Sequence, residues 1–542
     1  MNALAQHPSQ AGPVGACLAL DGVAEAVVWL RAHGVRRLVS DSRQLQAGDA
    51  FLAWPGAQHD ARRFLAQAAR AGSACALIDS QDASAWLVSA EEALHGADTG
   101  LPPVATLPSL KWLAGPLADL WWGQPSQQLD MLAVTGTNGK TSTSWWLAQS
   151  LGALGRPCGV AGTLGVGLLP ALDTTGLTTP DALALQQCLA QLRAQGAVAC
   201  AMEASSIGLV EGRLNGTRIS VALFSNFTQD HLDYHGSMQA YWEAKRSLFA
   251  WSGLRAAVLN VGDTRLAALA QELAEPTHAL ASLALWTVVQ HRGDGALPQA
   301  RLVAHDVVHA ADGLRFSVTE SGAGGGTLSV STPIIGGFNV DNLLLVLGGL
   351  RALGIGLAQA AAALSGLYAV PGRLQRVPLP PGVDASMSPE VVVDYAHTPD
   401  ALEKVLHSLR PWATQRAGRL WCVFGCGGDR DPVKRPLMGR VAADGADRVI
   451  LTSDNPRSED PHHILDGILA GVPASQRAAV VVLEDRRQAI AQVIADAAPQ
   501  DVVLVAGKGH EDYQEVRGQR LPFSDVVVAA ESLGVRPAGA RP

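Results

Sequence analysis

The sequence predicts an α/β protein of three domains whose sheets are mainly parallel, and two observations predict it. Short apolar runs of the kind found in buried strands alternate with segments of helical periodicity, which is the order of open parallel sheets. Many of these runs end in glycine, hydroxyl or charged residues, as expected where ligands bind at the carboxyl ends of parallel strands. A length of 542 residues accommodates about three or four domains of usual size.

Composition narrows the function classes. Apolar residues make up 48% and charged residues 17% of the chain, which is typical of a globular protein. No apolar run is long enough to span a bilayer and the first basic residue is Arg31, so we expect neither membrane insertion nor a secretory signal, and a cytoplasmic location. The net charge of −8 gives no case for nucleic acid, and small-molecule partners fit better. The seven scattered cysteines are expected to be reduced.

The first domain is expected to cover residues 1–125. Ser42 and Arg43 follow its first apolar run and could bind an anionic ligand, the alternative being a turn hydroxyl and a solvated charge. Strands are predicted at 38–40, 51–53 and 74–78, and helices at 62–71 and 110–122, before a linker-like segment at 123–126.

The second domain, expected over 126–367, opens with a glycine-bearing turn between an apolar run and a helix predicted from Thr141 to Leu154. The turn consists of Gly136, Thr137, Asn138, Gly139, Lys140 and Thr141. Backbone N–H groups of such a turn can point at phosphate oxygens, Lys140 adds a point charge, and the Thr141 hydroxyl can bind Mg²⁺. The alternative, an ordinary strand-turn-helix corner, does not account for Gly-Lys-Thr at this junction.

A second candidate in this domain is Glu203, at the end of the apolar run 197–202. A carboxylate there suits a Mg²⁺ ligand in a doubly wound sheet, and the alternative is a solvated acid. Downstream, His231 and His235 lack the further ligands of a zinc site. Lys245, on a helix predicted over 241–250, would by default be solvated.

Two further segments of the second domain are predicted without a role. Residues 280–330 are expected to form strands and turns over the sheet, and residues 336–342 to precede a long apolar helix ending near Leu353.

The third domain, expected over 368–542, repeats one pattern four times: an apolar strand runs into a glycine-rich or charged loop. Parallel strands would place all four loops at one edge of a sheet, where a binding site is expected. The strands and their loops are 391–393 with 394–397, 420–424 with 425–430, 448–452 with 454–457, and 502–505 with 507–511.

On these motifs the chain resembles the Mur ligases, ATP-dependent amide-forming enzymes of peptidoglycan synthesis. The motifs cover nearly the whole chain in the family's order, at 136–141, 202–206, 230–233, 339, 372–373 and 394–397. Segments 41–43, 425–431, 454–457 and 507–512 resemble the members that add the third peptide residue to UDP-N-acetylmuramoyl-L-alanyl-D-glutamate. The chain departs from the family pattern at Ile207, Glu211 and Ala57, where His, Gln and His are frequent.

The resemblance implies a domain for the UDP moiety, a central P-loop ATPase domain with a parallel sheet, and a C-terminal Rossmann-like α/β domain for the incoming amino acid. It implies ATP, Mg²⁺ and a CO₂-derived carbamate on Lys245 as cofactors, UDP-MurNAc-dipeptide and meso-diaminopimelate as partners, and a monomer. Lys140, Glu203, His231, Lys245 and Arg373 would be catalytic; residues 136–141, Asn339, Asp394 and His397 would bind ATP; Thr141, Glu203, His231 and Lys245 would bind metal. Ser42, Thr178, Thr179, Ser205, Glu211, Arg213, Arg430, Asp454, Asn455, Pro456, Arg457, Gly507 and Glu511 would bind the substrates.

Selection of the amino acid can be argued from charge. Diaminopimelate carries a carboxylate and an ammonium at its far end, whereas L-lysine carries only the ammonium. Arg457, with Arg430 nearby, suits the distal carboxylate, and Glu511 could accept the distal ammonium. Lysine in the same place would leave Arg457 unpaired beside another cation, so we expect it to be rejected.

Three alternatives remain open at this point. A ligase of another branch, or of the folylpolyglutamate synthase type, would share the ATPase core but lack the loop at 454–457. A nucleotide-binding regulator without turnover is disfavoured by the presence of Lys140, Glu203, His231 and Lys245. A generic NTPase is disfavoured because a separate Walker-B signature is missing.

Overall fold

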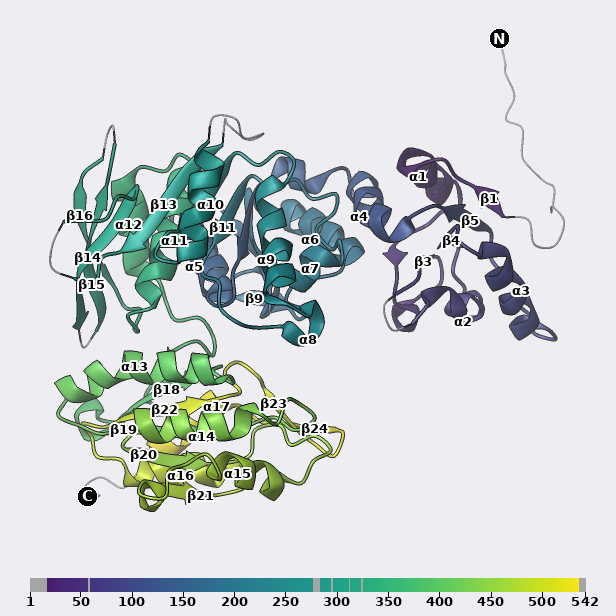
Figure 1. Ribbon diagram of the computed structural model, residues 1–542. Helices are drawn as coiled ribbons and strands as arrows, with labels where there is room; N and C mark the ends of the chain where they lie inside the picture. Colours follow the sequence, from purple (N-terminus) through teal and green to yellow (C-terminus); the bar gives the residue numbers. More distant parts are fainter. Residues whose placement is uncertain are drawn as a thin grey trace, which may run out of the picture. The chain divides into compact units, whose positions relative to one another are not determined.

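A computed structural model describes residues 17–56, 59–275, 283–293, 296–310, 312–322 and 325–535 (Figure 1). Ala57, one of the departures from the family pattern, lies outside the described residues. The chain falls into two compact units, one of residues 1–136, 156–222 and 228–256, the other of residues 137–155, 223–227 and 257–542. Among the described residues, no helix combines the length and apolar character needed to cross a bilayer.

The first sheet has five parallel strands, and its side chains alternate between two helical layers. Leu52 and Leu77 pack toward α1 and α4, while Phe51 and Ile78 pack toward α2 and α3. Its elements are β1 (Leu18–Ala19), α1 (Val23–Ala32), β2 (Leu38–Val39), β3 (Ala50–Ala53), α2 (Leu65–Arg70), β4 (Cys75–Asp79), α3 (Ala83–Leu94), β5 (Val104–Leu107) and α4 (Leu110–Trp121), with strand order β1-β5-β4-β3-β2. The strands and helices predicted for this part of the chain are confirmed.

The second sheet has eleven strands in the order β16-β15-β14-β13-β12-β11-β6-β10-β7-β8-β9. β10 pairs in parallel with both β6 and β7, which confirms a parallel arrangement around the glycine-bearing turn. The strands are β6 (Asp130–Thr135), β7 (Cys158–Gly162), β8 (Gly165–Leu168), β9 (Ala171–Asp173), β10 (Ala199–Glu203), β11 (Val221–Phe224), β12 (Ala256–Asn260), β13 (Ala284–Gln290), β14 (Leu302–Ala310), β15 (Gly313–Glu320) and β16 (Thr327–Thr332). The helices are α5 (Lys140–Ala153), α6 (Ala182–Ala194), α7 (Ser206–Val210), α8 (Leu232–His235), α9 (Met238–Arg246), α10 (Thr264–Ala274), α11 (Asn339–Ala352) and α12 (Leu357–Ala363).

The expectation that residues 280–330 lie over this sheet is wrong. β13, β14, β15 and β16 are hydrogen-bonded members of the sheet and extend one of its ends. Buried and less buried residues alternate along these strands, as in β15, which fits strands with one covered face and one more exposed face. The sequence, which has no motif here, did not distinguish strands within the sheet from strands that cover it.

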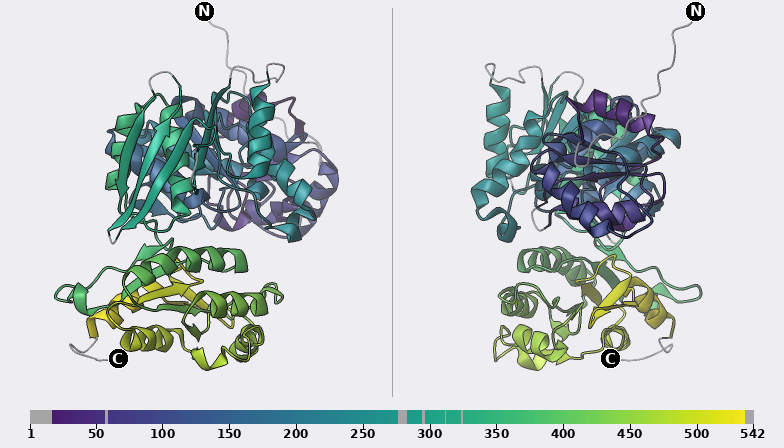
Figure 2. Two further views of the ribbon diagram at one scale, coloured as in Figure 1. Left: turned by 60° about the vertical axis from the view of Figure 1, so that its left-hand side comes forward. Right: turned by 90° about the vertical axis from the view of Figure 1, so that its right-hand side faces the viewer.

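The third sheet has six strands in the order β17-β18-β22-β19-β20-β21, flanked by helices on both faces (Figure 2). Apolar residues of α13, α14 and α15 pack on one face, and those of α16 and α17 on the other. The elements of this layered unit are β17 (Gln375–Arg376), β18 (Glu390–Asp394), α13 (Pro399–Gln415), β19 (Leu420–Phe424), α14 (Lys434–Gly445), β20 (Arg448–Leu451), α15 (Pro461–Leu469), β21 (Val480–Val482), α16 (Arg486–Asp496), β22 (Val502–Ala506) and α17 (Asp525–Val535). β23 (Tyr513–Val516) and β24 (Gln519–Pro522) form a separate antiparallel pair between β22 and α17 in the chain.

The four strands that precede the predicted binding loops, β18, β19, β20 and β22, are parallel to one another. Their loops therefore leave the same edge of the sheet, which confirms the prediction from the repeated strand-to-loop pattern. The domain limits expected at residues 125 and 367 stay predictions; they fall between β5 and β6, and between β16 and β17.

Beneath that edge lies a fully buried ion pair between Arg486 of α16 and Asp525 of α17. Arg486 Nε and Nη2 each donate to one carboxylate oxygen of Asp525, at 2.7 Å. The same guanidinium donates from Nη2 to the carbonyl of Ala506 at 2.9 Å and from Nη1 toward the carbonyl of Ser453 at 3.4 Å. These carbonyls directly precede Gly507 and Asp454, so the pair holds the bases of two of the four loops.

We expect Arg486→Met to lower the free energy of unfolding by about 3–5 kcal/mol, because it leaves the Asp525 carboxylate buried without its counter-ion. The double variant with Asp525→Leu should recover part of that loss. Chemical denaturation measures both. The matched control is Arg487→Met: Arg487 pairs with Glu531 between the same two helices, but both side chains are 57% exposed, so little change is expected. Equal effects of the two arginine substitutions would contradict the structural importance of the buried pair.

Candidate functional site

The turn between β6 and α5 is built around glycines that no other residue could replace without cost. Gly136 and Gly139 have φ of 141° and 85°, a region that favours glycine. A Cβ on Gly139 would also lie 2.2 Å from Oδ1 of Asn342. Asn342 of α11 therefore packs directly against the turn. Helix α5 begins at Lys140, the residue after Gly139.

Asn226, just after β11, fixes the conformation of the turn. Its carbonyl accepts the N–H of Thr137 and its side-chain oxygen accepts the N–H of Asn138, both at 2.9 Å. Lys140 Nζ donates to the carbonyl of Thr137 at 2.9 Å. The sequence pointed to the turn but not to the part played by Asn226, because 88 residues separate it from Asn138.

Asn339, predicted to bind ATP, is 4% exposed and engaged within the protein. Its Nδ2 donates to the carbonyl of Ile335 at 2.8 Å, and its Oδ1 accepts from Asn342 at 2.9 Å. Asn339 therefore also orients the Asn342 side chain that packs against Gly139.

Glu203 is 1% exposed, so the alternative of a solvated strand-end acid is wrong. Its Oε1 accepts the backbone N–H of Thr163 at 2.7 Å, and its Oε2 lies 3.3 Å from the Thr163 hydroxyl. A Cβ on Gly162 would come within 2.3 Å of Oε1. Sequence reasoning missed Gly162 and Thr163, although a glycine at the end of the adjacent strand β7 was a usable signal.

Four predicted substrate residues lie together next to Glu203. Thr179 Oγ1 donates to the Glu203 carbonyl at 2.8 Å and is 2.9 Å from Ser205 Oγ. Arg213 donates to the Thr179 carbonyl at 3.1 Å, and Thr178 accepts from the Thr163 hydroxyl at 3.2 Å. Thr179 is fully buried, so its hydroxyl braces the segment around it.

Lys245 is 1% exposed, so its default assignment as a solvated lysine is wrong. Its Nζ donates to the carbonyl of Gly136 at 2.7 Å and lies 4.6 Å from the centre of the Tyr241 ring. His231, with φ of 50°, is half exposed and has its ring centre 6.1 Å from that of Tyr241. Tyr241 thus contacts both predicted metal ligands of this segment. Within the described ranges, no three His, Cys, Asp or Glu side chains form a metal-ligating group by themselves.

Glu211 and Ser42 are placed by contacts within the first unit. Glu211 forms an ion pair with Lys111 at 2.8 Å and accepts a hydrogen bond from Tyr234. Ser42 is 8% exposed and donates to Gln67 at 3.2 Å. Lys111 also lines a hollow of about 380 Å³ at the carboxyl ends of β3, β4 and β5, with Pro55, Asp79, Ser80, Gln81, Pro108, Ser109 and Trp112.

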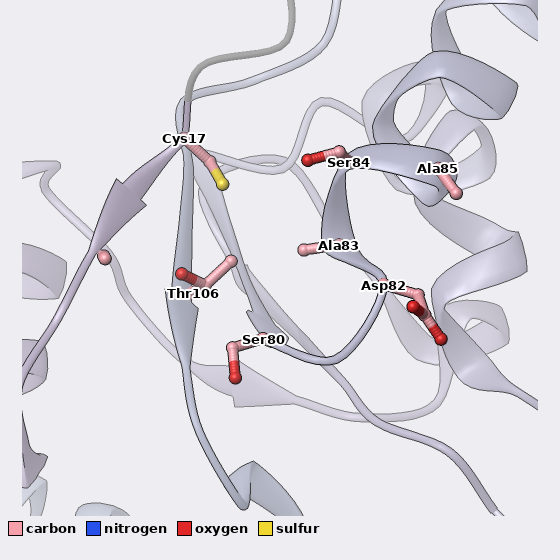
Figure 3. A pocket seen from close by; sticks show the side chains of 8 residues that line it. Cys17, Ser80, Asp82, Ala83, Ser84, Ala85 and Thr106 are labelled. Carbon is pink, nitrogen blue, oxygen red and sulfur yellow. The ribbon is translucent and has the colours of Figure 1, made fainter.

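A second hollow of the first sheet, about 510 Å³ in volume, is lined by Cys17, Ala19, Ser80, Asp82, Ala83, Ser84, Ala85 and Thr106 (Figure 3). None of the residues predicted to bind a ligand lines it. We therefore do not assign the predicted ligand-binding sites to this hollow, although it is larger than the one at Lys111.

In the third sheet, Arg373 and Asp394 lie on either side of one junction. Asp394 accepts the N–H groups of Leu374 and Ala396 at 2.7 and 2.8 Å, so it fixes the backbone next to Arg373. Burial raises the pKa of this carboxyl, and Arg373 counteracts that rise. The Arg373 guanidinium stacks on the ring of Tyr395 at 4.4 Å, and His397 is bound through Nδ1 to the Tyr395 carbonyl at 2.8 Å.

The loops after β20 and β22 bring Asn455 and Glu511 into contact. Asn455 Nδ2 donates to Glu511 Oε2 at 2.8 Å. Burial raises the pKa of the neighbouring Asp454 carboxyl. A Cβ on Gly507, whose φ is 114°, would lie 2.3 Å from Asp454 Oδ2, so the two loops approach each other without space for a side chain.

Arg457 stands in the left-handed region of backbone conformation, with φ of 52°. Its Nη1 donates to the carbonyl of Gly428 at 2.7 Å, and its side chain is 21% exposed. A Cβ on Gly427 would contact the side chains of both Arg457 and Arg430, so the two arginines are neighbours, as predicted. Pro456 packs its carbonyl against Gly428.

Two segments of the chain match domain families that are known from other proteins. Residues 134–349 match the Mur ligase middle domain, and residues 372–509 match the Mur ligase, glutamate ligase domain. These ranges contain the glycine-bearing turn and the edge of the third sheet, respectively.

Relatives of full length extend the match to nearly the whole chain. A UDP-N-acetylmuramoyl-L-alanyl-D-glutamate--2,6-diaminopimelate ligase of Acidovorax sp. (strain JS42) is 50% identical over 94% of this chain and 97% of its own. The ligase of the same name from Ralstonia nicotianae (strain ATCC BAA-1114 / GMI1000) is 45% identical over 95% and 96%. A solved structure of a protein of this name superposes with a TM-score of 0.63 at 35% identity, covering 92% of this chain and 95% of the other. The chain belongs to the Mur ligase family.

We expect Gly139→Ala to weaken ATP binding at least about ten-fold, because the added methyl meets Asn342 in a backbone conformation that alanine rarely adopts. Calorimetric titration with ATP measures the loss. Gly155→Ala is the matched control: Gly155 follows the other end of α5 with φ of 73°, but a Cβ there meets nothing within 4 Å. If both variants bound ATP as tightly as the parent, the contact with Asn342 would not shape the nucleotide site.

Proposed function

We propose that the chain is an ATP-dependent amide ligase that adds meso-diaminopimelate to UDP-N-acetylmuramoyl-L-alanyl-D-glutamate in peptidoglycan precursor synthesis. The observation that carries the proposal is the edge of the third sheet, where Glu511 and Asn455 are hydrogen-bonded beside Arg457 and Arg430. Relatives with the diaminopimelate name are 50% and 45% identical to the chain. This identity favours that branch over a ligase of the folylpolyglutamate synthase type.

The turn at 136–141 would hold the phosphates of ATP. α5 directs its N-terminus at the turn, and the partial positive charge there favours anions. When ATP binds, the Lys140 ammonium would donate to a phosphate oxygen in place of the Thr137 carbonyl. Arg373 and His397 would contact the nucleotide, whereas Asn339 and Asp394, whose polar atoms bind the protein itself, would act by positioning Asn342 and Arg373.

Two Mg²⁺ sites are proposed, one with Thr141 and Glu203, the other with His231 and carbamylated Lys245. A buried carboxylate, a hydroxyl and a carbamate supply the oxygen atoms that Mg²⁺ prefers, so the residues fit the ion. The environment of Lys245 also fits the modification: its amino group is buried next to the Gly136 carbonyl and the Tyr241 ring. When bound, the ions would neutralise phosphate charge.

The chemistry needed is the activation of a carboxylate, which is a poor electrophile. The glutamyl carboxylate of the substrate would attack the γ-phosphate, break its bond to the β–γ bridging oxygen and release ADP, leaving an acyl phosphate. The incoming amine would then attack the acyl carbon, expel inorganic phosphate and lose a proton to form the amide. Lys140 and Arg373 would stabilise the charge on the transferring group, and the loops would supply orientation and exclude water.

The UDP-muramoyl substrate would be bound by the first sheet and by the hydroxyl cluster beside Glu203. The hollow at Lys111 and Trp112 lies beside Glu211, which pairs with Lys111. Thr178, Ser205 and Arg213 would contact the peptide end, with Thr179 holding them in place. Ser42 would contact the uridine end.

For the chain as a whole we propose a cytoplasmic monomer with domains at 1–125, 126–367 and 368–542. The three sheets lie one in each of these ranges.

We expect purified protein to release phosphate from ATP when Mg²⁺, UDP-MurNAc-dipeptide and diaminopimelate are all present, and to stop when EDTA removes the metal. L-Lysine in place of diaminopimelate should give little release, because its distal end cannot pair with Arg457. A phosphate-release assay measures the reaction, and mass spectrometry of the product identifies which amino acid was added. Release with lysine but not diaminopimelate would refute the role of Arg457, and release with neither would favour a regulator without turnover.

We expect Lys245→Ala to reduce turnover about 10²–10³-fold, because an oxygen ligand near the phosphates is lost. Lys245→Glu, which offers a carboxylate in its place, should retain part of the activity. Enrichment with ¹³C-bicarbonate should give a carbamate NMR signal that Lys245→Ala abolishes. Lys404→Ala, in an exposed pair with Asp400, is the control. Full activity of Lys245→Ala would remove the carbamate from the proposal.

A further inference from the structure

Lys508, in the loop after β22, is a buried lysine to which sequence reasoning gave no function. Its side chain is 0% exposed. Nζ donates to Asn455 Oδ1 and to Glu511 Oε2, both at 3.0 Å, and lies 5.5 Å from the centre of the Tyr513 ring. With the bond from Asn455 Nδ2 to Glu511 at 2.8 Å, the three side chains form a closed hydrogen-bonded triangle.

We propose that Lys508 is a positioning residue that sets the preference of the amino-acid site for a zwitterionic distal end over a cationic one. The inference rests on the proposed function, because Asn455 and Glu511 are the residues assigned there to the incoming amino acid.

The first step of the argument is orientation. An ammonium group can only donate hydrogen bonds, so the Asn455 amide must turn its oxygen, and not its nitrogen, toward Lys508. The N–H of Glu515 also donates to this oxygen, at 2.9 Å. The amide nitrogen of Asn455 is thereby turned toward Glu511. Lys508 and the Glu515 N–H together determine which face of Asn455 meets Glu511, and Lys508 alone of the two also holds Oε2 of that carboxylate.

The second step is charge. Glu511 is already paired with an internal cation, so a lone ammonium on a substrate gains less from it than it would from an unpaired carboxylate. Lys508 also lies close enough to Asp454 to stabilise that carboxylate in its charged form. With Arg457 and Arg430 beside the site, a substrate that brings a carboxylate as well as an ammonium is favoured. Like-charge contacts of this kind suppress wrong partners.

The third step distinguishes this role from packing. An apolar side chain of similar length would fill the same space but would remove one donor from each acceptor, so that, among the described residues, the Asn455 oxygen keeps only the Glu515 N–H and the Glu511 carboxylate keeps only Asn455 Nδ2. A buried ammonium is costly unless its hydrogen bonds are made. Its placement on these two side chains, rather than on backbone carbonyls, ties its effect to the amino-acid site.

The experiment compares Lys508→Met, Lys508→Gln and Lys508→Arg with the parent protein by phosphate release. Initial rates give KM and kcat for ATP, UDP-MurNAc-dipeptide, diaminopimelate and L-lysine. Lys508→Met should lower the ratio of kcat/KM for diaminopimelate over L-lysine by about ten-fold or more, with KM for ATP and the UDP substrate within about two-fold of the parent. Lys508→Gln, which keeps a donor without charge, should also lose discrimination, whereas Lys508→Arg should retain most of it.

Thermal unfolding and the exposed-pair variant Lys404→Met serve as controls, and Lys508→Gln carries the test if Lys508→Met does not fold. An unchanged ratio in Lys508→Met or Lys508→Gln would overturn the inference while leaving the proposed function intact. A parallel rise of all KM values would show a general structural role and overturn it too. A parent protein without diaminopimelate-dependent release would refute the proposed function and the inference together.

Discussion

The buried pair of Arg486 and Asp525 is the interaction on which the working edge of the third sheet depends. A guanidinium can donate in several directions from one plane, and this one binds a carboxylate on one side and two loop carbonyls on the other. The loops beginning at Asp454 and Gly507 are thereby tied to the same rigid group. Of the residues assigned to the amino acid, Asn455, Arg457 and Glu511 stand on those two loops, and Arg430 stands on the loop after β19.

The loops after β20 and β22 lie very close to each other at this edge of the third sheet. Gly507 faces the Asp454 carboxylate where a side chain would not fit, so Asn455 comes within hydrogen-bonding distance of Glu511. The turn at 136–141 and the Glu203 carboxylate repeat this principle with Gly139 and Gly162. In each case a polar side chain occupies the volume that a methyl group would need. The Glu203 carboxylate there accepts the backbone N–H of Thr163, and the Asn342 amide is oriented by Asn339.

Much of the fold could be predicted from the sequence because buried parallel strands are continuous apolar runs, as in β10 and β19, and because the turn glycines sit at fixed spacing. The strands expected within residues 280–330 are present, but their place in the sheet was not predicted, because strands such as β15 alternate between buried and less buried residues and carry no motif. Contacts across long sequence separations could not be predicted: Asn226 with the turn, Lys508 with Asn455, and Thr163 with Glu203. The assignment of Asn339 and Asp394 to ATP stays a prediction, and the sequence did not indicate the hydrogen bonds that their side chains form within the protein.

The five residues from Gly507 to Glu511 serve two neighbours at once. Gly509 packs against Gly372 and Tyr395, and the His510 ring lies 5.2 Å from that of Tyr395, while Lys508 and Glu511 hold Asn455. An evolutionary change in this loop would therefore disturb the surroundings of Arg373 together with the choice of amino acid. Arg457, in the loop after β20, is held by two neighbours as well, because its side chain donates to the Gly428 carbonyl and its N–H donates to the Glu515 carbonyl of β23.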